Sequence, residues 1–281
     1  MSEATTSNRQ VQAKQWNWFP WLMAALLLPP IALPIAFALN SFKGERGQAA
    51  FQSIALQPSA EQVSPNFLEE VRALGQFPDH LDTSDAALPG RLAEAFARHP
   101  WVERVERVQL GSRGRIAVQL EYRQAVALVE ISGSTQRQAI TGKGIVLPAG
   151  ADLERWRGLP VIEAAPPPAG KPGERWGHAA VESAARIAAL LHGDRELFRV
   201  QAIRLREEGL ARQLILRTEG GSEVVWEAST GGGDEVPDAE KLRRLRAYAR
   251  EFGSLDRPAG PYRLDPRPST GLLRAPLGMS P

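Results

Sequence analysis

One uncharged apolar run near the N-terminus constrains the fold more than any other feature of this sequence. No Asp, Glu, Lys or Arg lies between Lys14 and Lys43, and residues 21–39 are apolar throughout. A helix needs about 20 apolar residues to cross the hydrocarbon core of a bilayer. The run therefore predicts a single transmembrane helix over residues 16–42, with tryptophans in the headgroup layer at its start.

Two other interpretations of this run stay open. Ala36-Phe37-Ala38 has the form of a signal-peptidase site, so the run could be a signal peptide that is removed. Its apolar length, however, exceeds the roughly 7–15 residues of a signal-peptide core. A buried helix of a soluble domain is disfavoured, because Pro29, Pro30 and Pro34 would interrupt its hydrogen bonding. We therefore expect an uncleaved anchor.

The charges that flank the run do not orient it. Arg9 and Lys14 precede it while Lys43 and Arg46 follow it, so the positive-inside rule returns a tie. Residues 1–15 are polar and lack apolar periodicity, which predicts a short disordered tail.

The composition excludes several classes of function. A formal net charge of +2 over 281 residues gives no general attraction for nucleic acid. The chain has no cysteine, so it has no disulfide framework, no thiolate nucleophile and no cysteine-based zinc site. With 43% hydrophobic and 23% charged residues, the rest of the sequence is typical of a globular protein. We expect an α+β fold beyond the span.

Apolar periodicity after the span predicts two successive units. In the first unit, alternating residues indicate strands and helical spacing indicates helices, with Ser64 as the N-cap of the first helix. The predicted order is strand, helix, helix, strand, strand, over residues 51–56, 64–75, 89–99, 101–110 and 116–122.

The second unit is richer in strands. They are predicted at residues 125–131, 136–141, 198–204, 212–218 and 222–227, with a last strand near Leu272. Helices are predicted at residues 176–192 and 238–252. The second helix has an apolar face made of Leu242, Leu245, Ala249 and Phe252.

Several segments carry a resemblance to one known family. Residues 92–105 are similar to a helix that ends in Pro-x-Val before a strand, and residues 116–127 to the strand that follows it. Residues 141–148 and 158–162 are similar to a hairpin and to a Leu-Pro-Val-Leu segment. The most specific similarity lies in residues 241–273, where a Lys-Leu helix precedes Leu-Asp-x-Arg, a glycine and a last strand. In these segments the chain resembles the FtsQ/DivIB family of bacterial cell-division proteins, and the element order of its first unit is that of a POTRA domain.

The resemblance implies a division of the chain into parts. These are a cytoplasmic tail (1–15), a transmembrane helix (16–42), a linker (43–50), a POTRA domain (51–123), a mixed FtsQ-type β-domain with flanking helices (124–277) and a short tail (278–281). The resemblance also implies a single-span divisome scaffold of the inner membrane at the division septum. Its C-terminal domains would then be periplasmic, and it would act through protein–protein contacts.

The resemblance further implies a binding site for FtsB/FtsL-like division proteins. It assigns partner binding to residues around the last strand, namely Gly271, Leu272, Leu273 and Arg274. It assigns a structural role, fixing the preceding turn, to Leu264, Asp265 and Arg267. The chain departs from the family at Pro268, where a tyrosine is common. Proline lacks a backbone N–H, so we expect the binding edge to begin just beyond it.

No constellation of catalytic residues is found in the sequence. His80, His99, His178 and His192 are not spaced as metal ligands on a helix, and we assign them structural roles. His99 is expected to act as a cation at the C-terminal end of a helix. Gly231-Gly232-Gly233 lacks the Lys-Ser/Thr pair of a phosphate loop. We therefore expect no enzymatic activity, no cofactor, no metal site and no small-molecule substrate.

Two alternatives accompany this interpretation. The helix over residues 238–252 contains five basic residues: Lys241, Arg243, Arg244, Arg246 and Arg250. They predict either a solvated helix face or a contact surface for an acidic partner. For the whole protein, the alternative function is that of an envelope chaperone or secretion protein with a POTRA-like domain.

Overall fold

The computed structural model describes residues 47–60, 63–148, 156–208, 211–228 and 236–278 of the chain. These residues form an α+β fold with mixed sheets. The predicted transmembrane helix over residues 16–42 lies outside them. Within the described residues, no helix is both long and apolar enough to cross a membrane.

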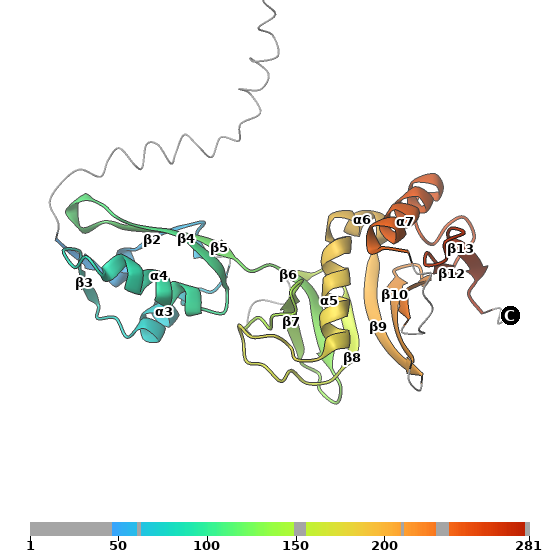
Figure 1. The fold of residues 1–281 in the computed structure, drawn as a ribbon, viewed down its shortest axis with the longest axis horizontal. Helices are drawn as coiled ribbons and strands as arrows, with labels where there is room; N and C mark the ends of the chain where they lie inside the picture. The colour runs from blue at the N-terminus through green and yellow to red at the C-terminus, as the bar shows by residue number, and fades with distance from the viewer. Residues whose placement is uncertain (1–46, 61–62, 149–155, 209–210, 229–235, 279–281) are drawn as a thin grey trace, which may run out of the picture.

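The first half of the fold is a small sheet with two helices packed on it (Figure 1). Its elements are β2 (Ala55–Gln57), α3 (Phe67–Gly75), α4 (Leu88–Arg98), β4 (Val102–Leu110) and β5 (Ile116–Tyr122). The strand order is β2-β5-β4, with β2 parallel and β4 antiparallel to β5. The predicted order of strand, helix, helix, strand, strand is therefore found. The helices and the sheet bury an aromatic core that includes Phe51, Phe67 and Phe96.

The start of this half differs from the sequence prediction. The strand predicted over residues 51–56 is wrong in its first part, because Phe51–Ser53 forms a 3₁₀ turn. The predicted linker 43–50 contains a short strand, β1 (Gln48–Ala50), which pairs antiparallel with β3 (His80–Asp82). Neither β1 nor β3 was predicted, because three residues carry too little alternation to reveal a strand.

The first helix also begins later than predicted. Its N-cap is Asn66 rather than Ser64. The Ser64 Oγ instead accepts a hydrogen bond from the Asn66 N–H at 3.3 Å and donates one to Glu70 at 2.9 Å. The Ser64 hydroxyl therefore closes a turn ahead of α3.

The second half is built on an eight-stranded sheet, ordered β13-β12-β11-β10-β9-β8-β6-β7. The strands are β6 (Ala125–Ile131), β7 (Arg137–Thr141), β8 (Val161–Ala165), β9 (Val200–Glu208), β10 (Ala211–Thr218), β11 (Glu223–Ala228), β12 (Tyr262–Asp265) and β13 (Leu273–Pro276). The pairs β6–β8, β8–β9 and β11–β12 are parallel and the others antiparallel.

Helices cover one face of this sheet, and the side chains buried between the helices and the strands form the core of the second half. α5 (Ala179–Leu191) contacts β6 to β10, while α6 (Arg195–Phe198) contacts α7 (Asp238–Phe252), as Figure 1 shows. α7 has the bounds that the periodicity predicted. Its predicted apolar face is also found, since Leu242, Leu245 and Ala249 are buried and Phe252 packs against the core.

Only two residues join the halves, because β5 ends at Tyr122 and β6 begins at Ala125. Side chains nevertheless pack across the junction. Trp156 joins the buried cluster of the first half, and its ring centroid lies 6.1 Å from that of Trp101. The sheets are therefore in contact through more than the connecting chain.

Candidate functional site

The predicted site residues meet at one end of the eight-stranded sheet. β12 pairs antiparallel with β13, so that Leu264 lies opposite Arg274 and Asp265 lies opposite Leu273. Gly271 adopts a φ of +130° in the turn that leads into β13, a conformation that favours glycine. The structure thus brings the structural group and the partner-binding group of the sequence prediction together.

Asp265 and Arg267 close the turn after β12. The Arg267 backbone N–H and Nε donate to Asp265 Oδ1 at 3.0 and 2.9 Å, and Arg267 Nη2 donates to Oδ2 at 2.7 Å. Burial acts to raise the pKa of Asp265, but the hydrogen bonds and charge of Arg267 outweigh it and lower that pKa. The carboxylate is therefore charged at neutral pH and holds the turn. Leu264 is fully buried beside it.

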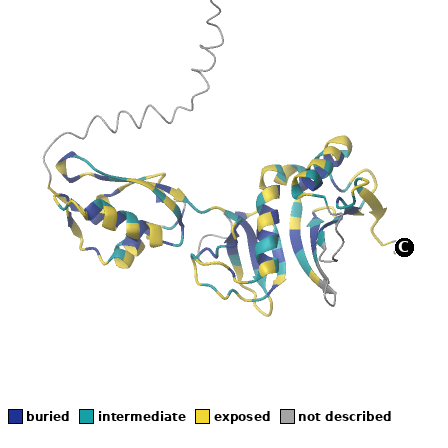
Figure 2. Ribbon diagram, viewed as in Figure 1, coloured by how far each residue is buried: buried dark blue, intermediate teal, exposed yellow. Residues whose placement is uncertain are grey.

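The two leucines at β13 have different surroundings. Leu272 is partly buried and packs against the core of the second half, whereas Leu273 is 54% exposed. Every residue of β13 is exposed, as Figure 2 shows near the C-terminus. Leu273 and Ala275 alternate along β13 and so share one face of the strand, and Leu277 follows directly after its end.

β13 is an open sheet edge. It pairs with β12 on one side, and no other strand of the described residues lies beyond it. The opposite edge of the sheet is covered, because the Leu147 N–H donates to the Ala139 carbonyl of β7 and the Thr141 N–H donates to the Ile145 carbonyl, each at 3.0 Å. Of the two edges, the one at β13 therefore has main-chain groups that a partner strand could pair with, whereas those of β7 are already hydrogen-bonded.

Arg274 points its side chain at the protein. The guanidinium carbon lies 5.8, 5.6 and 5.0 Å from the ring centroids of Tyr248, Phe252 and Tyr262, and Nη1 lies 3.2 Å from the Tyr248 hydroxyl. Cation–π contacts at exposed sites are each worth about 0.5–1 kcal/mol. The Arg274 side chain therefore holds β13 against α7. Arg274 can contact a partner through its main chain only.

Much of the basic character of α7 is used inside the protein. Lys241 is only 4% exposed and donates to the Trp226 carbonyl at 3.0 Å, so its assignment to a surface patch is wrong. Arg246 pairs with Asp194 at 2.6 Å. Arg243 pairs with Glu240, which lowers the pKa of that carboxyl to about 2.

Arg244 has a role that the sequence did not reveal. Its guanidinium donates to the carbonyls of Pro266 at 3.0 Å, of Ser269 at 3.3 Å, and of Pro268. It therefore holds the loop between β12 and β13 against α7. No local pattern signals this contact, because the loop lies more than 20 residues away along the chain.

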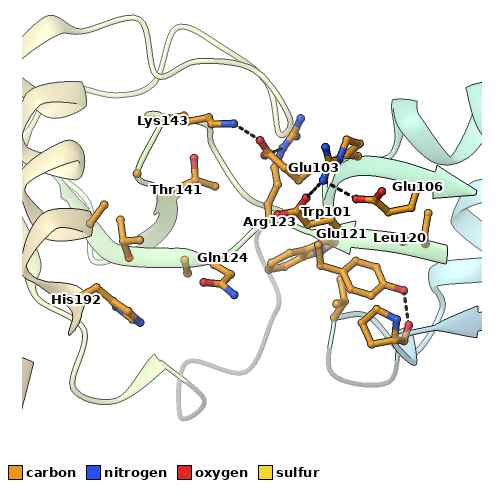
Figure 3. Close-up of a pocket in the computed structure, with 18 of the residues that line it drawn as sticks. Trp101, Glu103, Glu106, Leu120, Glu121, Arg123, Gln124, Thr141, Lys143 and His192 are labelled. Carbon is orange, nitrogen blue, oxygen red and sulfur yellow. Dashed lines mark hydrogen bonds and ion pairs between the residues drawn. The ribbon is translucent and has the colours of Figure 1, made fainter. Parts of the chain in front are cut away.

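A second group of charges lines a cleft of about 1310 Å³ between the two halves (Figure 3). Glu103 on β4 pairs with Arg123 at 3.2 Å and with Lys143 of the second half. The hydrogen bond from Lys143 is the main cause that lowers the pKa of Glu103. Arg123 also donates to the Pro100 carbonyl at 2.9 Å and to that of Gly173 at 3.5 Å. Glu103, Arg123 and Lys143 thus connect the two halves through ion pairs, and we call these three residues the latch. The sequence analysis did not identify it.

The environment of His99 contradicts its predicted role. The ring is 1% exposed, and burial lowers its pKa, although the nearby Glu70 carboxyl opposes this shift. His99 is therefore neutral at pH 7 and does not act as a cation at the end of α4. Within the described residues, no group of three or more His, Asp or Glu side chains could hold a metal ion.

No protein-family model matches the chain, and no curated protein matches it.

Proposed function

We propose that this protein is a cell-division scaffold of the FtsQ/DivIB type, anchored in the inner membrane by residues 16–42. Residues 51–123 would be its POTRA domain and residues 124–277 its β-domain, both on the extracytoplasmic side at the septum. In this role it binds FtsB/FtsL-like proteins and so connects early division proteins to septal peptidoglycan synthesis. The proposal is supported by the strand–helix–helix–strand–strand order of the first half and by the motif similarities of the second.

The observation that carries the proposal is the open edge at β13. An unpaired edge strand accepts an extended segment of a partner through main-chain hydrogen bonds, and side chains that alternate along it add specificity. Leu273 in β13 and Leu277 just after it are 54% and 37% exposed, beside the edge that such a segment would meet. The turn held by Asp265 and Arg267, and the loop held by Arg244, keep this edge in place before a partner arrives.

We expect two substitutions in β13 to weaken partner capture. The Leu277 N–H donates to the Pro261 carbonyl, and in the same register the N–H groups of Leu273 and Ala275 face β12. Leu273→Asp puts a charge where an apolar contact is proposed, and Arg274→Pro removes a backbone N–H that faces away from β12. Each should lower the amount of FtsB/FtsL pair that co-purifies with the full-length chain by about tenfold or more, as expected for removing a central apolar contact. The melting temperature should change by no more than a few degrees, because both residues are exposed.

Leu74→Asp is the matched control for this experiment. Leu74 lies on α3 and is 42% exposed, so the substitution changes the same chemistry far from β13. Unchanged capture by both β13 variants would place the interface elsewhere. Recovery of secretion components in place of division proteins would favour the envelope chaperone alternative. A reporter fused after Pro281 that is active only in the cytoplasm would refute the topology.

A further inference from the structure

The β4–β5 hairpin carries positive charge at its far end. Residues 107–120 contain the arginines Arg107, Arg113 and Arg115 and no acidic residue, and all three arginines are exposed. Within the described part of the chain, Arg107 and Arg113 have no ion-pair partner. The hairpin tip, defined as residues 107–115, is therefore a compact basic surface.

The hairpin tip lies beside the point where the described chain begins. A Cβ added at Gly114 would approach the Gln48 carbonyl oxygen to 2.6 Å, so the tip touches β1. Eight Cα–Cα steps separate Leu39, the end of the apolar run, from Gly47. Even a fully extended chain covers only about 28 Å in that number of steps. An anchor that ends at Leu39 therefore keeps the tip close to the membrane surface.

We propose that the hairpin tip rests on the anionic lipid headgroups of the membrane that holds the anchor, with Arg107 and Arg113 on lipid phosphates. This inference depends on the proposed function, because it requires residues 16–42 to span the bilayer. Each arginine near an anionic surface strengthens binding about fivefold, and the effect fades within a Debye length. The tip points away from the C-terminus (Figure 1), so the contact leaves β13 at the far end of the molecule, free for a partner.

Acidic neighbours reduce this charge without cancelling it. Asp82 on β3 lies opposite Gln48 and accepts a hydrogen bond from the Ser84 N–H at 2.8 Å. Asp85 pairs with Arg91 at 3.5 Å. Within the described residues, one carboxylate without a basic partner is thus set against two arginines without an ion-pair partner, Arg107 and Arg113, and the surface remains positive.

A fluorescent probe at the tip tests the contact. The chain has no cysteine, so Gln109→Cys provides a unique labelling position on β4. The labelled full-length protein is placed in nanodiscs with nitroxide-headgroup lipid, either in phosphatidylcholine alone or with about one third phosphatidylglycerol. We expect quenching to be several-fold stronger in the anionic discs and to fall to the neutral level at about 0.5 M salt.

A triple variant and a matched control identify the residues responsible. Arg107→Gln, Arg113→Asn and Arg115→Gln together should abolish the difference between the two lipid mixtures. Asparagine is chosen at Arg113 because the backbone there has a φ of 57°, which asparagine tolerates. The control removes three exposed arginines from the second half and should leave the quenching unchanged: Arg137→Gln, Arg250→Gln and Arg263→Gln.

Two results would overturn the inference. Equal quenching in neutral and anionic discs, or quenching that survives the triple variant, would show that the tip does not bind anionic lipid even though the chain is anchored. A chain that fails to enter the discs would instead refute the anchor, and with it both the proposed function and the lipid contact.

Discussion

His99 shows how burial changes the chemistry of a single residue. Its Nδ1 accepts a hydrogen bond from the Trp101 N–H at 3.3 Å, so the neutral ring carries its proton on Nε2, which lies 2.8 Å from Glu70. The edge of the ring packs on Phe67, with centroids 4.5 Å apart. The residue is therefore a neutral core side chain with a hydrogen bond at each ring nitrogen.

This environment predicts that stability falls as the pH drops from 7 to 5. Because burial lowers the pKa of His99 in the folded state, the unfolded chain binds more protons in this range, and stability rises with pH. The loss begins as the pH falls through the unfolded value of about 6.5. Urea unfolding of wild type and His99→Gln at pH 7 and pH 5 measures it. The variant should be less stable at pH 7, by about 1–3 kcal/mol, and less sensitive to pH.

His80→Gln is the control for this prediction, since His80 is exposed on β3. Carboxyls with a lowered pKa, such as Glu103 and Asp265, change charge below the range tested. An equal pH dependence in wild type and His99→Gln would show that another group is responsible.

At the scale of the element, β13 depends on contacts from outside its own four residues. Its hydrogen bonds to β12 hold its main chain. The cation–π contacts of Arg274 with Tyr248, Phe252 and Tyr262 hold its side chain against the protein. A short strand at a sheet edge has little stability of its own. We therefore regard Arg274 as a residue that positions the edge for a partner.

Arg274→Met should loosen β13 while the rest of the sheet stays folded. The substitution keeps an apolar side chain but loses the cation–π contacts and the hydrogen bond to Tyr248, together about 1–2 kcal/mol. Backbone amides of β13 should then exchange with solvent about 5 to 30 times faster. Hydrogen exchange of the full-length chain measures this, with Arg263→Met on β12 as the control. Unchanged exchange in β13 would assign the strand's position to its pairing with β12 alone.

At the scale of the whole molecule, the latch of Glu103, Arg123 and Lys143 holds the halves at one angle. Arg123 contacts both halves, and a Cβ added at Gly173 would lie 3.3 Å from Pro100 Cα, so the two surfaces are close. The angle matters for the proposed function, because it sets where β13 lies relative to the hairpin tip.

Glu103→Gln should widen the range of angles between the halves. The neutral amide keeps the shape but loses two ion pairs, each worth about 0.2–1 kcal/mol near the surface. Spin labels at Gln109→Cys and Ala247→Cys, in a chain that otherwise lacks cysteine, report the distance between the halves. The distance distribution should broaden, whereas Glu106→Gln, which removes only a contact with Arg104, should leave it narrow. A narrow distribution in Glu103→Gln would show that aromatic packing alone sets the angle.

Local periodicity was enough to predict most helices and longer strands. The bounds of α7 and β6, and the order of elements in the first half, follow from which residues are apolar and how they are spaced, because each pattern is complete within one element. The starts of elements were less predictable. At Ser64 a hydroxyl can cap a turn or a helix, and the sequence is the same in both cases.

The sequence by itself thus determined the types of the longer elements and the one apolar run long enough to span a membrane. It could not determine the strand order, the open edge at β13, or which charges are buried. Arg246 meets Asp194 across 52 residues and Glu103 meets Lys143 across 40, so these pairs exist only once the chain has folded. Burial of His99 and Lys241 likewise comes from elements that pack over them, and it is this packing that changed the roles expected from their charge.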